Sequence, residues 1–348
     1  MTIHPEALAT YCVSVLRQTG MSDTDAQVTA GALVTTDTWG VFTHGVKNLR
    51  GYVRRLRGGG LRPHGRPSVT REGLAWTLVD GDSAIGMVTS VFAMRAALAK
   101  ARQSGIAYVG VRNSCHFGAA GYYASLALPE GMIGIAMCND TPTVTVPGAR
   151  GPVLGSNPLA FAVPAGAEKP ILLDMATSTV AGGKVFAAAA LGKSIPENWI
   201  VDARGLPTAD PAGWPQAGAL TPMAGHKGYG IALLIETLSA ILPGAAIASQ
   251  VLSWSFANAS LATGHGAAFL AIDIGAFMPR EEFEERVAQT IREIRTAPKA
   301  EGADRIYLPG EMEWERREQA LRDGIEFPPD VGESLRALEE ETGLKLPS

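Results

Sequence analysis

Asn113-Ser-Cys-His-Phe-Gly-Ala-Ala-Gly-Tyr-Tyr123 is a polar turn that separates the apolar run 105–111 from a helix-like stretch. The run is typical of a buried strand, so the segment predicts a strand, a turn and a helix in that order. Small residues at 118–121 leave room for a ligand to approach the backbone. We therefore interpret His116 as a candidate active-site residue at the end of a strand.

A second phrase of the same kind, Thr43-His44-Gly45, lies upstream. A single histidine in a folded protein usually lies in the core or at the surface with its hydrogen bonds made, and has no catalytic role. Here two histidines stand in glycine-bearing polar turns, which is a more specific observation. We expect His44 and His116 to belong to one active site.

Apolar runs alternate with helical stretches from Ala75 to about Ile274, and this alternation predicts a mixed α/β or α+β fold. The expected strands are 76–80, 106–111, 132–137, 159–163, 171–174 and 269–274. The expected helices are 86–101, the stretch from the His116 turn to about 128, and 228–242. The last of these is the most apolar, so we expect it to be the central, buried helix and to end at Pro243-Gly244.

Both ends of the chain have helical patterns. Helices are expected over 5–19, 22–37 with a Ser22 cap, and 46–56, and charged amphipathic helices over 281–295 and 311–323. The cations of the third helix are interpreted as a solvated face: Lys47, Arg50, Arg54, Arg55 and Arg57. The predicted organisation is a helical region over residues 1–70, an α/β cofactor-binding domain over 71–280, and a helical region over 281–348 that packs with the first.

The composition restricts the class of protein. The chain has 348 residues, of which 46% are hydrophobic and 18% charged, enough for one large or two medium domains with a buried core. The formal net charge of −4 disfavours nucleic acid as a partner. Three cysteines without a Cys-x-x-Cys pair indicate reduced thiols and a cytoplasmic protein, and we expect neither a signal peptide nor a membrane span.

Several common motifs are missing from the sequence. No Gly-x-Gly-x-x-Gly follows a strand, so the ordinary dinucleotide fingerprint is absent. Gly192-Lys193-Ser194 resembles the end of a P-loop, but Ala187 stands where that loop needs a glycine. The histidines are scattered and no Gly-x-Ser-x-Gly elbow occurs. We therefore expect no metal site and no α/β-hydrolase.

Short polar phrases with glycine or proline remain, and each alone has an explanation as a turn. They are Thr43-His44-Gly45, 113–118, 155–158, 174–178, 225–230 and 309–311. Together they suggest a large ligand that is held mainly by backbone groups. Lys227, at a predicted helix start, has two interpretations: a phosphate contact and an exposed turn lysine.

The order and spacing of these phrases resemble the malate/L-lactate dehydrogenase family, which also contains ureidoglycolate, sulfolactate and diketogulonate dehydrogenases and piperideine-carboxylate reductases. The shared phrases are His-Gly, Asn-Ser-x-His-Phe-Gly, Gly-Ser-Asn-Pro, Asp-x-Ala-Thr-Ser, Lys-Gly-Tyr-Gly and Pro-Gly-Glu, and the resemblance covers residues 5–345. It implies NAD(P)-dependent reduction of a 2-oxo acid or a cyclic imine on a sheet unrelated to the Rossmann domain. It also implies a homodimer with cofactor sites near the subunit interface.

The resemblance implies roles for single residues. His116 matches the catalytic acid/base, and His44 matches a second active-site histidine that donates to substrate. Histidine suits the task because its ordinary pKa of about 6.5 lies near operating pH. Thr43 replaces the usual serine, and Tyr52 matches a tyrosine that lines the pocket.

The resemblance also assigns the cofactor contacts, without distinguishing NAD from NADP. The matching residues are Asp140, Asp174, Met175, Ala176, Thr177, Ser178, Lys227, Gly228, Pro309, Gly310 and Glu311.

Asn48 departs from the family pattern, which has an arginine four positions after the His-Gly histidine. Arginine binds a carboxylate with two hydrogen bonds and a charge, whereas asparagine is neutral. Either Lys47 or Arg50 compensates, or the substrate presents a different group there. The candidate substrates are a small 2-oxo/2-hydroxy acid and, alternatively, a cyclic imino acid such as piperideine-2-carboxylate. A non-catalytic ligand-binding protein is a third hypothesis, which the two histidines disfavour.

Overall fold

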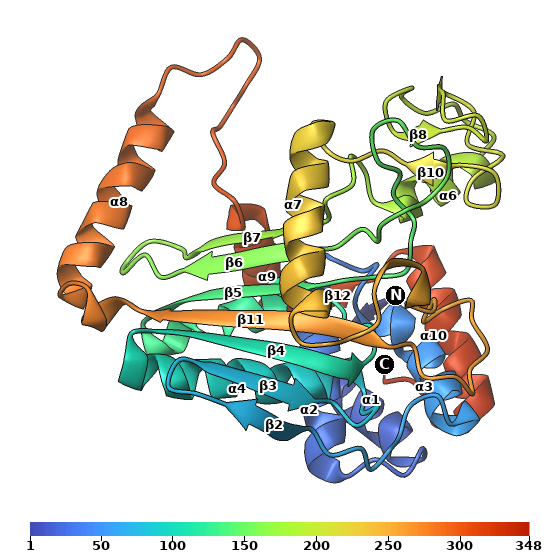
Figure 1. Ribbon diagram of the computed structural model, residues 1–348, viewed down its shortest axis with the longest axis horizontal. Coiled ribbons are helices and arrows are strands. Elements are labelled where there is room, and N and C mark those ends of the chain that lie inside the picture. The colour runs from blue at the N-terminus through green and yellow to red at the C-terminus, as the bar shows by residue number, and fades with distance from the viewer. Residues whose placement is uncertain (348) are drawn as a thin grey trace.

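Figure 1 shows the computed structural model, which describes residues 1–347. Its centre is a seven-stranded sheet with the strand order β2-β3-β4-β11-β5-β6-β7. The strands are β2 (Ser68–Glu72), β3 (Trp76–Asp80), β4 (Ile106–Ser114), β5 (Met132–Cys138), β6 (Leu159–Val163), β7 (Ile171–Met175) and β11 (His265–Asp273). Within this sheet β3 and β4 run parallel, and the other neighbours are antiparallel. The expectation of a mixed α/β fold is confirmed, and the sheet differs from the parallel sheet of a Rossmann domain.

Helices surround this sheet and also form a separate cluster. The α-helices are α1 (Pro5–Arg17), α2 (Asp23–Thr38), α3 (Leu49–Gly58), α4 (Gly86–Ser104), α5 (Ala120–Ser125), α6 (Gly182–Ala190), α7 (His226–Glu236), α8 (Arg280–Thr296), α9 (Glu311–Asp323) and α10 (Pro329–Thr342). Short 3-10 turns lie at Val46–Asn48, Leu128–Glu130, Ala248–Gln250 and Ile274–Ala276, and a π-helical turn, Thr237–Ile241, extends α7.

The alternation of side chains along β11 explains how the sheet is covered on both faces. Phe269 and Ala271 belong to the core beneath α4 and α5. Ala268 and Leu270 pack on the opposite face, with Ile235 of α7. Successive side chains of a strand point to opposite faces, so a strand buried on both must be apolar throughout. This is the pattern of the 267–272 run.

Both ends of the chain contribute to one helical cluster beside the sheet (Figure 1). The short strands β1 (Thr2–Ile3) and β12 (Ile325–Glu326) pair with each other. The cluster core combines Leu8 and Leu33 with Val331 and Leu335 of α10. Helix α8 instead extends along the far end of the sheet (Figure 1). The division of the chain at residues 70 and 280 stays a prediction.

A small unit stands above β6 and β7 (Figure 1). It consists of α6 and a three-stranded sheet of very short strands, β8 (Ile200–Val201), β9 (Pro207–Thr208) and β10 (Ala219–Leu220). Trp214 and Val185 lie in its own small core. Two-residue strands carry no periodic signal, which is why the sequence pattern did not predict this sheet.

The expectation that the apolar stretch 228–242 is the central, buried helix is wrong. Helix α4 has 19 residues, ten of them buried, against 11 residues with four buried in α7. Leu233 and Leu234 of α7 remain 44% and 57% exposed. Only one side of α7 contacts the sheet, and hydrophobic content alone does not reveal which sides of a helix are covered.

The interpretation of the cations after His44 as one solvated face is wrong at Arg55, which is fully buried. Its guanidinium donates hydrogen bonds to the carbonyl oxygens of Asn258 and Leu261. Buried arginine is tolerated where carbonyl groups replace water in this way. Helix α3 is thereby fastened to the loop before β11.

No helix within residues 1–347 combines the length and the apolar character that crossing a membrane requires.

The packing of α5 on β5 predicts the effect of a single methyl group. A Cβ at Gly134 would lie 2.2 Å from the Ala124 carbonyl oxygen, whereas a Cβ at Gly230 meets nothing within 4 Å. We expect Gly134→Ala to lower the free energy of unfolding by about 1–3 kcal/mol through overpacking. Gly230→Ala is the matched control and should raise it slightly, by about 0.4–1 kcal/mol. Urea unfolding of both variants tests this, and equal midpoints would contradict the described packing.

Candidate active site

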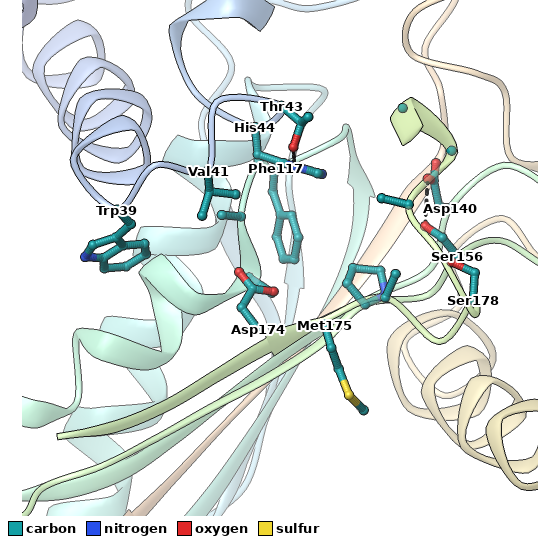
Figure 2. A pocket seen from close by; sticks show the side chains of 18 of the residues that line it. Trp39, Val41, Thr43, His44, Phe117, Asp140, Ser156, Asp174, Met175 and Ser178 are labelled. Carbon is teal, nitrogen blue, oxygen red and sulfur yellow. Dashed lines mark hydrogen bonds between the residues drawn. The ribbon is translucent and has the colours of Figure 1, made fainter. Parts of the chain in front are cut away.

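A cavity of about 890 Å³ lies where the helical cluster meets the ends of β5 and β7. Figure 2 shows Thr43 and His44 on one wall and Asp140, Ser156 and Ser178 on another. The predicted residues that line it are Thr43, His44, Asn48, His116, Asp140, Asp174, Met175, Ala176, Ser178, Pro309 and Gly310. Phrases that are far apart in the sequence therefore share one cavity.

His116 lies in the turn between β4 and α5, as the Asn113–Tyr123 segment predicts. Its Nδ1 is 2.6 Å from the hydroxyl of Tyr52, which is fully buried in α3. The ring of Trp254 stacks on His116, with ring centres 4.5 Å apart and planes inclined by 14°. One ring nitrogen and one ring face are thus occupied by protein, which leaves Nε2 as the nitrogen available to a ligand.

The turn that carries His44 is held by a buried carboxyl group. Asp37, at the end of α2, accepts a hydrogen bond from the Val46 backbone N–H at 2.8 Å. A Cβ at Gly45 would lie 1.8 Å from Asp37 Oδ1, so only glycine allows this approach. His44 Nδ1 is 2.9 Å from the hydroxyl of Thr43, and the His44 and His116 ring centres are 5.8 Å apart.

The surroundings keep both histidines neutral. Both rings line the cavity, and the remaining parts of each ring are surrounded by protein. Burial, together with the neighbouring His44, lowers the pKa of His116 from 6.5 to about 3. Burial likewise lowers the pKa of His44. A charged imidazolium loses its hydration in such a place, so the neutral form is favoured. At neutral pH each ring offers one donor and one acceptor nitrogen.

Asp140 faces the histidines from the loop after β5. Burial alone would raise the pKa of its carboxyl, but hydrogen bonds with His265 and with the Thr141 backbone N–H lower it. The Asp140 Oδ1 to His265 Nε2 distance is 3.2 Å, and His265 Nδ1 is 2.8 Å from the Thr263 hydroxyl. Asp140 is therefore an ionised carboxylate whose orientation is set by a fully buried pair.

The end of β7 supplies a third group of cavity residues. Asp174 accepts a hydrogen bond from the Gly121 backbone N–H at 2.7 Å. The Asp174 side chain is open to the cavity, and its partial desolvation there raises the pKa of the carboxyl to about 6. Thr177 is buried behind the wall, where its N–H and hydroxyl both donate to the Ser156 carbonyl oxygen. It supports the wall and does not line it.

Pro309 and Gly310 line the cavity next to the Leu172 backbone. Glu311 does not line it. Its carboxylate, only 3% exposed, accepts from the Leu308 N–H and pairs with Arg295 and Arg305. Glu311 thus holds the 308–310 turn in place.

Lys227 and Gly228 are not among the residues that line the cavity. Lys227 is exposed in the first turn of α7. Gly228 is buried against Met223, whose carbonyl oxygen would lie 2.1 Å from an added Cβ. The turn before α7 is nevertheless bonded to the cavity wall, because the Met223 N–H donates to the Thr177 carbonyl oxygen at 2.9 Å.

Asn48 lines the cavity, and its side-chain amide donates to the Thr43 carbonyl oxygen at 2.9 Å. Neither of the cations expected to compensate for the missing arginine is free. Lys47 Nζ is 2.6 Å from Asp330 Oδ2, and Arg50 pairs with Glu341. The neighbourhood of Asn48 is therefore polar without an available positive charge.

Sequence reasoning missed Trp254, His265 and Asp37. The available signal for Trp254 was the alternation of serine with aromatic residues in Ser253-Trp-Ser-Phe256. The signal for His265 was Thr263-Gly264-His265-Gly266, a polar His-Gly phrase similar to Thr43-His44-Gly45. Asp37 gave no signal, since it lies within a helix and acts through the Val46 N–H.

No cluster of three or more histidine, cysteine, aspartate or glutamate side chains suited to a metal ion occurs within residues 1–347. The arrangement instead combines two neutral imidazoles, one ionised carboxylate and an extended cavity. Such a site can exchange a proton with a bound oxygen or nitrogen atom while excluding much of the water.

The burial of His116 predicts its titration. NMR titration of the imidazole should give a pKa clearly below the ordinary value of about 6.5. A His116→Ala variant assigns the signal. Tyr52→Phe should shift it, because the variant removes the hydroxyl at Nδ1. A His116 signal that titrates near 6.5 in the wild-type protein would contradict the described environment.

Known proteins resemble this chain over nearly its whole length. Residues 3–336 match the family model for malate/L-lactate dehydrogenase. A malate dehydrogenase from Pyrococcus horikoshii is 38% identical, with 98% of this chain and 95% of the relative covered. A delta(1)-pyrroline-2-carboxylate/delta(1)-piperideine-2-carboxylate reductase from Pseudomonas putida is 33% identical over 93% of each chain. The solved structure of sulfolactate dehydrogenase from Methanocaldococcus jannaschii superposes with a TM-score of 0.91 at 36% identity, covering 99% of this chain and 98% of that one. The chain belongs to the malate/L-lactate dehydrogenase family and is an oxidoreductase.

Proposed function

We propose that this protein transfers hydride between a nicotinamide cofactor, NAD or NADP, and a small 2-oxo/2-hydroxy acid. The observation that carries the proposal is the pair His44 and His116 at the junction of the helical cluster and the sheet, with Tyr52 on His116 Nδ1. The names of the relatives, malate and sulfolactate dehydrogenase, support the substrate class.

His116 is the proposed acid/base. Oxidation of a hydroxy acid requires a base that accepts the hydroxyl proton, and a neutral imidazole is ready to accept it. In the reducing direction the same nitrogen returns the proton to the developing alkoxide. For this role Nδ1–H donates to the Tyr52 oxygen, which fixes the ring orientation and leaves Nε2 unprotonated. Burial keeps Tyr52 a phenol by raising its pKa. His44 is the proposed donor to the substrate.

The cavity fits a nicotinamide dinucleotide in size and in chemistry. Its volume of about 890 Å³ lies within the usual range for ligand sites, and its walls are mainly apolar with a few polar groups. The bound cofactor would supply or accept the hydride. Asp140, the turn 174–178, Pro309 and Gly310 are the proposed contacts, with Thr177 and Glu311 supporting them. Lys227 and Gly228 are candidates only if a second copy of the chain brings that turn to the cavity.

A reductase of a cyclic imino acid is the second candidate. The likeness to the Pseudomonas putida reductase favours it. An imine is most reactive towards hydride when protonated, so its reduction should accelerate as pH falls through the pKa of the imine. Comparing oxo-acid and imine reduction at several pH values separates the two candidates.

Replacing His116 tests the proposed function. His116→Ala should lower kcat for every accepted 2-oxo acid by about 10²–10⁴-fold, the usual contribution of general acid–base catalysis. The assay is oxidation of NADH or NADPH with a panel of 2-oxo acids. His64→Ala, at an exposed histidine, is the matched control and should retain activity. Full turnover by His116→Ala would refute the role of this residue.

We also propose that the protein is a homodimer. Helix α7 and its π-helical extension keep an apolar outer side exposed, consisting of Leu233, Leu234, Ile241 and Leu242, each 44–57% exposed. A contiguous apolar surface of this kind usually marks a protein interface. A second copy of this chain is the proposed occupant, and a twofold axis would pair the same surface on both subunits.

Leu234→Asp should dissociate the dimer, because it buries a carboxylate in an apolar interface. Sedimentation velocity measures the change from dimer to monomer. Leu74→Asp, at another exposed leucine (72% exposed), is the control and should leave the dimer intact. A monomeric wild-type protein, or a dimeric Leu234→Asp variant, would contradict the proposed interface.

The three cysteines, Cys12, Cys115 and Cys138, are free and buried. Unpaired thiols are usual in reducing compartments and support the proposed cytoplasmic location.

A further inference from the structure

The charges around the substrate end of the cavity are already balanced or negative. Lys47 is the one lysine or arginine among the cavity residues within 1–347, and Asp330 pairs with it. Asp140 lies close enough to both active-site histidines to affect their protonation. A second carboxylate on the substrate would therefore meet like charge.

The aromatic ring of Trp254 lines the same end of the cavity. The Trp254 ring stacks on Tyr52 as well as on His116, with a ring-centre distance of 5.1 Å to Tyr52. A Cβ at Gly51 would lie 2.9 Å from the Trp254 ring, so the indole is closely packed against α3. Its remaining surface faces the cavity.

The loop that carries Trp254 is firmly attached. Arg55 donates to the carbonyl oxygens of Asn258 and Leu261, and Arg54 donates to that of Ser255. The Gly60 N–H donates to the Ala259 carbonyl oxygen at 2.9 Å. These bonds hold the loop on helix α3, so Trp254 is a fixed part of the site and not a mobile side chain.

Two further aromatic residues line the cavity. Phe256 follows Trp254 on the same loop and is 77% exposed, while Phe186 of α6 is 44% exposed. Phenylalanine is costly to leave in water, and an apolar ligand would cover it favourably. Trp254 therefore provides apolar surface beside His116, and Phe186 and Phe256 add apolar surface to the rest of the cavity.

We propose that the substrate carries a single carboxylate and an uncharged, apolar side group that packs against Trp254, so that dicarboxylates are poor substrates. This inference rests on the proposed function and specifies its substrate class. Trp254 and Asn48 are the residues that determine specificity. The amide of Asn48, bound to the Thr43 carbonyl oxygen, provides polarity there without charge.

Two four-carbon substrates test the inference directly. Oxaloacetate and 2-oxobutanoate differ in a terminal carboxylate against a methyl group. We expect kcat/KM for 2-oxobutanoate to exceed that for oxaloacetate by about tenfold or more, because the second carboxylate of oxaloacetate meets like charge. Equal values, or a preference for oxaloacetate, would overturn the inference while leaving the proposed function intact.

Substitutions at position 48 test whether this residue determines the preference between the two substrates. Asn48→Arg should shift the ratio of the two kcat/KM values towards oxaloacetate by about tenfold, because a guanidinium binds the second carboxylate. Asn48→Gln, which stays neutral, is the matched control and should not shift it. An unchanged ratio in Asn48→Arg would show that position 48 does not determine specificity.

Trp254→Ala should lower the ratio of kcat/KM for 4-methyl-2-oxopentanoate to that for pyruvate by about tenfold. The ratio cancels any general effect on His116. Trp254→Phe should retain the ratio, since it keeps an aromatic surface and guards against misfolding of the alanine variant. A ratio that is unchanged in Trp254→Ala would contradict packing of the side group on Trp254.

The same measurements distinguish a failure of this inference from a failure of the proposed function. If no 2-oxo acid is turned over, the proposal of a 2-oxo acid substrate is refuted. Binding then still ranks the ligands, through the fluorescence change that wild-type protein shows and Trp254→Phe lacks. Tighter binding of malate than of 2-hydroxybutanoate in that measurement would overturn the apolar pocket as well.

Discussion

The hydrogen bond between Tyr52 Oη and His116 Nδ1, 2.6 Å long, joins the two regions of the molecule that make the site. Tyr52 belongs to the helical cluster built from both chain ends, and His116 follows strand β4 of the central sheet. Trp254 stacks on both rings and extends the connection to the loop before β11. The site therefore exists only where cluster and sheet are packed together, and each region contributes one histidine.

Burial, more than any single charge partner, sets the protonation states in this region. It lowers the pKa of His44 and His116 and raises the pKa of Asp37 and Asp174. Asp140 is the exception, because contact with His265 offsets its desolvation. Neutral histidines beside one ionised carboxylate suit proton exchange with a substrate oxygen. A low-polarity wall strengthens each of these interactions.

Much of the fold could be predicted because its signals are local. Most strands of the central sheet are short apolar runs bounded by turns, whereas the unpredicted β2 is polar and exposed. The Ser22 cap accepts from the Asp25 N–H at the start of its own helix. The predictions were wrong where contacts between residues far apart in the sequence decide whether a side chain is buried. Arg55 is charged yet buried, since carbonyl groups some 200 positions later accept its hydrogen bonds. Helix α7 is apolar yet half exposed, because the sheet covers only one side of it.

The sequence by itself determined the strand–turn–helix around His116, the phrase around His44 and the residue types of the cavity wall. These depend on backbone geometry and on side-chain periodicity within a few residues. Only the tertiary structure decided which phrases meet. Lys227 is not among the residues that line the cavity, and the Asn48 amide donates to the Thr43 carbonyl oxygen. Trp254 and His265 contact the active-site residues His116 and Asp140. Such contacts join residues far apart in the chain, so they follow from how whole elements pack and have no local pattern.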